Sequence, residues 1–197
     1  ILDELAMGED SPTDTVHDAF QLAVHGDRPI GRPVGGTAQA IREVERADVW
    51  EHYQAHYGPS SLIVAAAGNV DHESVCERVQ AALDGSPWDG RSAAAPRPRR
   101  STAPSPIADH DKDVTRRRDV TQAHVIIGCE GLSATDPAGP TMSVLLSVLG
   151  GSMSSRLFQE VREKRGLAYT TYAFDVAYSD TGTFGMYAGC SPDKVDE

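Results

Sequence analysis

The feature that most constrains the fold is a stretch near the middle of the chain in which no apolar side chains recur periodically. Residues 86–111, SPWDGRSAAAPRPRRSTAPSPIADHD, are rich in Pro, Ser, Ala and Arg. This composition is typical of a linker, which has too little apolar surface to form a core. In a chain of 197 residues, it predicts two domains of roughly 100 residues or fewer instead of one large domain. We therefore expect the domains to be 1–85 and 112–197.

The first half of the chain is predicted to consist of helices and one strand. Ser11 is a candidate N-cap for a helix, and two further helices are expected, one ending near residue 44 and one at 47–57. Residues 61–70, SLIVAAAGNV, form an apolar run typical of a buried strand. Asp71 is placed to cap the helix that follows it.

The second half mixes strands and helices. Its apolar patterns predict strands at 121–131, 169–180 and 182–191, and helices at 136–151, at 154–166 and from 191 onward. The residues between the last two strands carry the turn signal of a β-hairpin. Each half thus has helices near strands, which suggests an ancient duplication, although no sequence repeat is present.

Charge and apolar content exclude several classes of protein. The net charge is −11, and both ends of the chain are acidic while residues 93–118 are basic. Because most of the chain is acidic, no nucleic-acid surface is expected, and a charged partner would be cationic. The longest apolar run, 62–68, is far shorter than the ~20 residues that cross a bilayer, so no membrane association is expected.

Cysteine and arginine usage bear on the compartment and the source. Cys76, Cys129 and Cys190 are widely separated and form no CxxC pair, which favours a reducing compartment and argues against disulfides or a thiolate zinc site. Arg far outnumbers Lys, which suggests a GC-rich bacterial genome. We expect a cytoplasmic bacterial protein, with the mitochondrial matrix as the alternative.

Three places could hold a metal ligand. His52 and His56 lie four residues apart, a helical spacing that zinc can use, but surface or packing roles explain them more simply. HESVC, which includes His72 and Cys76, begins like a zinc motif without completing it. Glu4 precedes LAM near the end of a predicted helix, where a solvated charge is the simpler interpretation. The chain has no GxSxG motif and no phosphate-binding glycine loop.

The segment VREKRGLAY contains an Arg and a Tyr seven residues apart. The preceding helix is expected to bury an apolar stripe that consists of Met153, Leu157, Phe158 and Val161. Arg162 lies at the margin of this stripe. Tyr169 follows at the start of a strand. Arg can grip a carbonyl or carboxylate, and a Tyr hydroxyl can donate to a developing oxyanion. The alternative is an interfacial Arg and a Tyr whose ring packs against its neighbours.

These stretches resemble a known family. SSRLFQEVREKRGLAYTTYAF, with LGG before it and TQAHVIIG upstream, resembles the C-terminal domain of the M16 (pitrilysin-type, inverted zincin) metallopeptidases, in the branch of mitochondrial processing peptidase and its bacterial relatives. ILDELAMGEDSPTDTVHDAF, GDRPIGRPVGG and HYGPSSLIVAAAGNVDHE resemble the stretch that follows the HxxEH helix of that family. The resemblance covers nearly the whole chain in the correct order.

The resemblance implies roles for three residues. Glu4 matches the family's third zinc ligand, while Arg162 and Tyr169 match the pair that binds substrate and stabilises the tetrahedral intermediate. The implied fold is α+β, with two similar units of mixed, mostly antiparallel sheet and helices on one face, both incomplete in this chain. Incomplete sheets leave apolar faces uncovered, so association with the missing segment, or with another copy in a homodimer or heterodimer, is expected.

The chain departs from the family in one respect that decides its expected activity. HxxEH is absent, and a single carboxylate does not hold Zn²⁺. We therefore expect a fragment, inactive and zinc-free alone, of a zinc-dependent endopeptidase that hydrolyses unfolded peptides. The acidic charge would favour cationic ones. The alternatives are a non-catalytic scaffold or peptide-binding subunit of the same fold, and an unrelated α+β binding domain.

Overall fold

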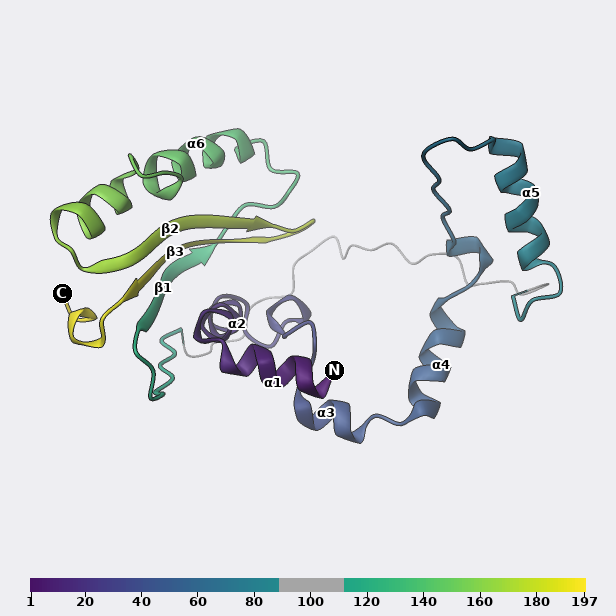
Figure 1. The fold of residues 1–197 in the computed structure, drawn as a ribbon, viewed down its shortest axis with the longest axis horizontal. Coiled ribbons are helices and arrows are strands. Elements are labelled where there is room, and N and C mark those ends of the chain that lie inside the picture. Colours follow the sequence, from purple (N-terminus) through teal and green to yellow (C-terminus); the bar gives the residue numbers. More distant parts are fainter. Residues whose placement is uncertain (89–111) are drawn as a thin grey trace. The chain divides into compact units, whose positions relative to one another are not determined.

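The structure is a computed structural model that describes residues 1–88 and 112–197 (Figure 1). Of the described residues, 1–41 and 112–197 form one compact unit and 42–88 form a second. The predicted linker at 86–111 lies almost wholly outside the described residues, and the domain limits at 85 and 112 stay a prediction. None of the helices in the described part is long and apolar enough to cross a membrane.

Two helices open the first unit, α1 (Leu2–Asp10) and α2 (Pro12–His25). The predicted cap of α2 is confirmed, because the Ser11 side chain accepts a hydrogen bond from the Asp14 amide at 3.3 Å. Gly26 ends the helix with a positive φ of 60°, a conformation that glycine adopts without steric cost. The short helices η1 (Pro29–Gly31) and α3 (Ala38–Glu43) follow.

The sheet of this unit has three strands, β1 (Ala123–Glu130), β2 (Ala168–Ala177) and β3 (Gly182–Cys190), in the order β1-β3-β2. Both pairings are antiparallel. Strands β2 and β3 form the predicted hairpin, which is therefore confirmed. Central strand β3 contains most of the buried sheet residues, because it has a partner along each edge.

Helices cover both faces of this sheet. Helix α6 (Gly139–Gly150) lies on one face (Figure 1), where a Cβ added at Gly150 would lie 2.1 Å from the amide nitrogen of Ala173. Helix α2 packs on the other face, where Phe20 meets Phe174 with ring centroids 5.7 Å apart. The expectation of helices on one face only is wrong for this sheet, because α2, from the first half of the chain, covers the second face.

Two predicted helices of the second half have a different geometry. The helix before β2 contains a π-helical segment, η3 (Phe158–Lys164), and the C-terminal helix is limited to η4 (Pro192–Lys194). Three members of the predicted buried stripe are half-buried, but Met153 is 74% exposed. Met153 lies before the helix begins, so helical periodicity does not place it.

The second unit contains α4 (Arg46–His56), η2 (Pro59–Ser61) and α5 (His72–Leu83). Asp71 caps α5 as predicted, accepting from the Ser74 amide at 2.8 Å. The strand predicted at 61–70 is wrong, since these residues form no ladder and Ile63 is 89% exposed. A strand needs a neighbour for its backbone groups, and none of the described residues pairs with it.

Candidate functional site

Arg162 lies in the π-helical segment η3, whose wider turn is often found at functional sites. Its guanidinium carbon lies 4.7 Å from the centroid of the Phe158 ring, a cation–π contact that orients the planar group. The Arg162 side chain is exposed and makes no hydrogen bond or ion pair within 1–88 and 112–197. Its donors therefore remain available to a ligand.

Tyr169 lies in an irregular part of the sheet. Ala168 pairs with Cys190 and Thr170 pairs with Gly189, so Tyr169 is the extra residue of a β-bulge. At a β-bulge the extra residue is left unpaired in the strand ladder, and its side chain points in a different direction from that of a regular strand. Tyr169 is 58% exposed, and its side chain makes no hydrogen bond or aromatic ring contact with the described residues.

The turn between Arg162 and Tyr169 is held by backbone contacts. Gly166 has a φ of 60°, and its carbonyl accepts a hydrogen bond from Lys194 Nζ at 2.7 Å. The Leu167 amide donates to the Val161 carbonyl at 2.9 Å. These contacts hold the backbone between η3, which carries the exposed Arg162, and the start of β2, where Tyr169 is exposed. An Arg can bind a carbonyl or carboxylate, and a Tyr hydroxyl can donate to an oxyanion.

Glu4 is not brought to this pair. It lies on α1, its side chain is 81% exposed, and its carboxylate is 3.5 Å from the amino group of Ile1. Figure 1 shows α1 beside α2 and away from the end of β2 at which Tyr169 lies. No hydrogen bond or ion pair among the described residues joins Glu4 to Arg162 or Tyr169. The structure therefore separates the predicted metal ligand from the predicted substrate-binding pair.

The described residues do not fit a zinc ion by themselves. No group of three or more His, Cys, Asp or Glu side chains in this part of the chain could hold a metal. His52 and His56 are neighbours with ring centroids 4.4 Å apart, but both are exposed and no third ligand joins them. A stable zinc site needs at least three protein ligands, and no such set is present among the described residues.

Sequence reasoning missed a cluster of aromatic rings between α2 and the sheet. His17 Nε2 lies 2.9 Å from the Tyr172 hydroxyl, and His124 Nδ1 lies 2.7 Å from the Tyr187 hydroxyl. Burial lowers the pKa of His17, with Asp14 opposing that effect, and burial raises the pKa of Tyr172. In the sequence, the one feature that points to this cluster is that His17 lies one helical turn from Phe20, on the same side of the predicted helix.

A buried polar cluster lies further along the same contact. His25 is completely buried, and neither ring nitrogen has a partner among the described residues. Arg28 lies 3.5 Å from Glu130, whose carboxylate also accepts a hydrogen bond from Thr181 at 2.8 Å. Burial lowers the pKa of His25, an effect that Glu130 opposes and Arg28 reinforces.

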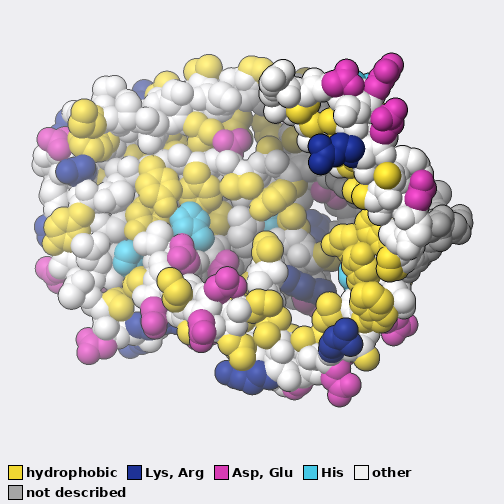
Figure 2. Space-filling view, turned by 45° about the vertical axis from the view of Figure 1, so that its right-hand side comes forward, with side chains coloured by type: hydrophobic (Ala, Val, Ile, Leu, Met, Phe, Trp, Pro, Cys, Tyr) yellow, Lys and Arg dark blue, Asp and Glu magenta, His cyan; other side chains and the backbone are white. Residues whose placement is uncertain are grey.

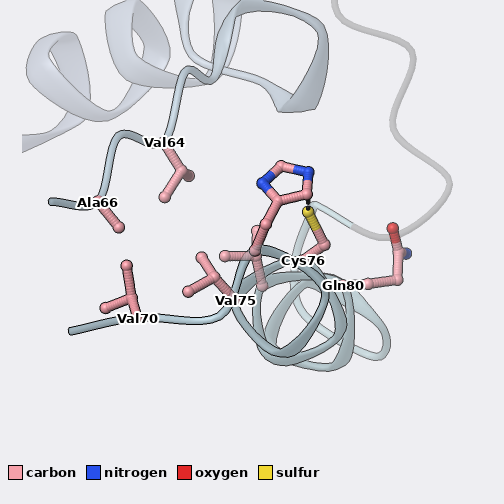
Figure 3. A pocket seen from close by; sticks show the side chains of 8 residues that line it. Val64, Ala66, Val70, Val75, Cys76 and Gln80 are labelled. Atoms are coloured by element: carbon pink, nitrogen blue, oxygen red, sulfur yellow. Dashed lines mark hydrogen bonds between the residues drawn. The ribbon is translucent and has the colours of Figure 1, made fainter. Parts of the chain in front are cut away.

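The second unit contains an apolar hollow of about 400 Å³. Figure 3 shows Val64, Ala66 and Val70 facing Val75 across it, with Cys76 at its edge. The Cys76 sulfur lies 3.5 Å from Nε2 of His72, and both side chains are exposed. These two residues do not form the zinc site that HESVC resembles, since no third ligand is near.

Comparisons with known proteins were made for the whole chain. The sequence profile described as "Peptidase M16 inactive domain" matches residues 43–197. An uncharacterized zinc protease of Streptomyces coelicolor is 46% identical over 198 residues, covering 100% of this chain and 43% of that protein. An uncharacterized zinc protease of Bacillus subtilis is 31% identical over 197 residues, covering 100% of this chain and 46% of that protein.

Solved structures show the same fold. The peptidase M16 inactive domain from Pseudomonas fluorescens superposes with a TM-score of 0.67 at 20% identity, covering 96% of this chain and 44% of that one. A chain of complex III2 from Candida albicans superposes with a TM-score of 0.74 at 20% identity, covering 98% and 46%. The α+β class is thus confirmed, and the chain spans less than half the length of the relatives it matches.

Proposed function

This chain belongs to the M16 peptidase family, and from that premise we propose that the full-length protein is a zinc-dependent endopeptidase. Relatives in Streptomyces and Bacillus are named zinc proteases. The residues described here would supply the substrate-binding part of its active site and one zinc ligand. A bacterial cytoplasmic location, and domain limits at 85 and 112, belong to the same proposal.

The observation that carries the proposal is the placement of Arg162 and Tyr169. Both residues lie on irregular backbone, a π-helical turn and a β-bulge, and both keep their polar groups exposed. Because the guanidinium and the hydroxyl are exposed, their donors can bind a ligand that displaces water. Arg162 would bind a peptide carbonyl or carboxylate of the substrate, and the Tyr169 hydroxyl would donate to the oxyanion that forms during hydrolysis.

Glu4 would be the zinc ligand contributed by this chain. Its carboxylate is exposed on α1, and it would join ligands from the HxxEH helix, which we place in a segment outside these residues. When bound, zinc would activate water for hydrolysis. Substrates would be unfolded peptides, and the net charge of −11 favours cationic ones.

We further propose that the active site forms between two copies in a homodimer, or between two related chains in a heterodimer. The support is that Glu4 lies on α1, apart from η3 and the start of β2, which carry Arg162 and Tyr169, and that no contact among the described residues joins Glu4 to them. The apolar hollow of the second unit would be covered by the rest of the full-length protein.

The first experiment assays peptide hydrolysis by the full-length protein with and without a chelator. Arg162→Ala and Tyr169→Phe should each lower kcat/KM by about 10²–10³-fold, the loss of roughly 2–4 kcal/mol of transition-state stabilisation. Arg165→Ala, which removes a neighbouring exposed cation, is the matched control and should leave kcat/KM within about twofold. Unchanged turnover in both test variants would refute the assigned roles.

A second experiment tests whether the site is shared between copies. Full-length Glu4→Gln and Tyr169→Phe proteins are each expected to be inactive or nearly so. If one copy supplies the zinc ligand and another supplies Tyr169, mixing and reassociating the two variants restores a fraction of wild-type activity, roughly a quarter. No restoration in a verified mixed dimer would place both residues in the same copy.

A second candidate function is a non-catalytic scaffold or peptide-binding subunit of the same fold. The matching profile is described as an inactive domain, which favours it. Such a protein would bind peptides, or a partner subunit, without chelator-sensitive hydrolysis. Binding of a cationic peptide that weakens in Arg162→Ala, with no turnover by the full-length protein, would support this reading over the enzyme.

A further inference from the structure

We propose that His17 is a positioning residue that fixes strand β2, and with it the bulge that carries Tyr169, against helix α2. The inference rests on the proposed function, because it gives His17 a role in supporting a residue that would act on substrate. His17 itself would touch neither substrate nor metal.

The contact between His17 and β2 combines a hydrogen bond with ring packing. Nε2 of His17 lies 2.9 Å from the Tyr172 hydroxyl. The plane of the imidazole is within 9° of the planes of both Tyr172 and Tyr187, at centroid distances of 6.4 and 6.0 Å. One half-buried side chain from α2 therefore contacts two adjacent strands and sets how they lie on the helix.

The same set of rings continues across the sheet. Tyr172 and Tyr187 stack with centroids 4.6 Å apart, and Tyr187 is hydrogen-bonded to His124 at 2.7 Å. Contacts that begin at α2 thus reach β2, β3 and β1 in turn. The two hydrogen bonds are joined by the stacked rings of Tyr172 and Tyr187, so each of the three strands has a side chain in the same set of contacts.

Tyr169 depends on such support because its side chain has no hydrogen bond or aromatic ring contact with the described part of the chain. The bulge at Tyr169 interrupts the β2–β3 ladder. On one side of the bulge, the Lys194 ammonium holds Gly166. On the other side, three residues after Tyr169, Tyr172 is fixed by His17. The direction of Tyr169 is therefore set by backbone that is held at both ends.

The rest of the contact between α2 and the sheet does not need His17. Phe20 meets Phe174 edge-on at 5.7 Å and an interplanar angle of 81°, and Gln21 Nε2 lies 3.4 Å from the Thr183 hydroxyl. These contacts keep α2 on the sheet when the hydrogen bond of His17 is removed. Variants that lose only this hydrogen bond should therefore fold.

The test uses the full-length protein and three variants, His17→Phe, Tyr172→Phe and the double variant, all of which keep a ring at each position. Each should lower kcat for peptide hydrolysis about tenfold while KM stays within about twofold, since a small misplacement of a group acting on the transition state lowers kcat. The double variant should be no worse than either single one, because both remove the same interaction. Phe20→Leu is the control: it lowers the melting temperature through lost packing but should leave kcat within about twofold.

Hydrogen exchange supplies a readout that does not depend on catalysis. Amides of residues 168–172 should exchange about fivefold faster in His17→Phe and Tyr172→Phe, and not in Phe20→Leu. If the wild-type protein shows no hydrolysis, the proposed function fails, and faster exchange at the bulge would still support the positioning role. Unchanged exchange in both variants, or an equal kcat loss in Phe20→Leu, would overturn it.

Discussion

Two apolar stretches of similar composition, residues 61–70 and 123–130, adopt different structures. The later stretch is strand β1, which pairs with β3 along its whole length. The earlier stretch has equally strand-like residues but forms no ladder, and its Ile63 and Val64 are 89% and 51% exposed. The difference teaches that an apolar pattern specifies a strand only where another strand can satisfy its backbone groups.

The contrast extends to the units that contain these stretches. In residues 112–197, together with 1–41, helices pack on both faces of a sheet. In residues 42–88, large apolar side chains such as Val49 and Trp50 are at least half exposed, and the space-filling view shows hydrophobic side chains open on the surface (Figure 2). Soluble proteins rarely leave such surface uncovered unless another segment or partner binds it.

The largest expected difference is in hydrogen exchange of this 197-residue chain. Amides of β3, which is paired on both edges, should exchange on the order of 10³-fold more slowly than amides of 63–67, since those have no backbone partner among the described residues. Helix α5 serves as an internal control, because its amides are bonded within the helix and should be intermediate. Equal protection of β3 and 63–67 would contradict the contrast between the two stretches.

The next largest effect concerns the tight contact of α6 with the sheet. Gly150→Ala should destabilise the protein by about 3 kcal/mol, because its Cβ would meet the backbone of Ala173 at 2.1 Å. Gly139→Ala, in the same helix, has open space around the added methyl and should be neutral within about 0.5 kcal/mol. Urea unfolding followed by circular dichroism measures both. Similar losses in the two variants would mean that α6 does not pack closely on β2.

A smaller effect separates the chain alone from the full-length protein. Ile63→Lys should change the stability of the 197-residue chain by less than about 0.5 kcal/mol, since the side chain is already in water. In the full-length protein, where we propose that this stretch is covered, the same change should cost about 2 kcal/mol. Ile63→Leu is the conservative control and should be neutral in both. A full-length protein indifferent to Ile63→Lys would show that the stretch stays exposed.

Local signals in the sequence predicted much of the fold. Ser11 and Asp71 cap their helices through hydrogen bonds three residues away, so the information lies within a few residues. The hairpin of β2 and β3 is likewise local. The strand at 61–70 was wrong because its formation depends on a partner that local sequence does not contain, and Met153 was misplaced because the helix starts after it.

The candidate site divides in the same way. The spacing of Arg162 and Tyr169 could be read from nine consecutive residues, although the π-helical turn and the bulge that carry them could not. The contact of His17 with Tyr172 spans 155 positions, and no periodicity connects positions so far apart. The separation of Glu4 from the pair is a property of the folded chain, so sequence order alone gave no reason to expect it.

The smallest predicted effect is a pH dependence that arises at His25. Burial lowers the pKa of this imidazole below its ordinary value of 6.5, so the unfolded chain binds a proton more readily than the folded one. Stability is therefore fully present above about pH 6.5 and is lost as the pH falls from there toward the lowered folded pKa. Below that pKa both states are protonated and the loss stops.

The measurement compares urea midpoints at pH 7.5 and 5.5 in the wild type and in His25→Phe, which fills a similar volume and does not titrate. The wild-type midpoint should fall with acidification, and the fall should be smaller in the variant by the contribution of His25. His17→Phe should show a similar partial reduction, because burial also lowers the pKa of His17. His72→Phe, in the other unit and at an exposed position, should keep the full wild-type fall. If His72→Phe reduces the decrease in urea midpoint as much as His25→Phe does, the loss of stability in acid does not arise at the contact between α2 and the sheet.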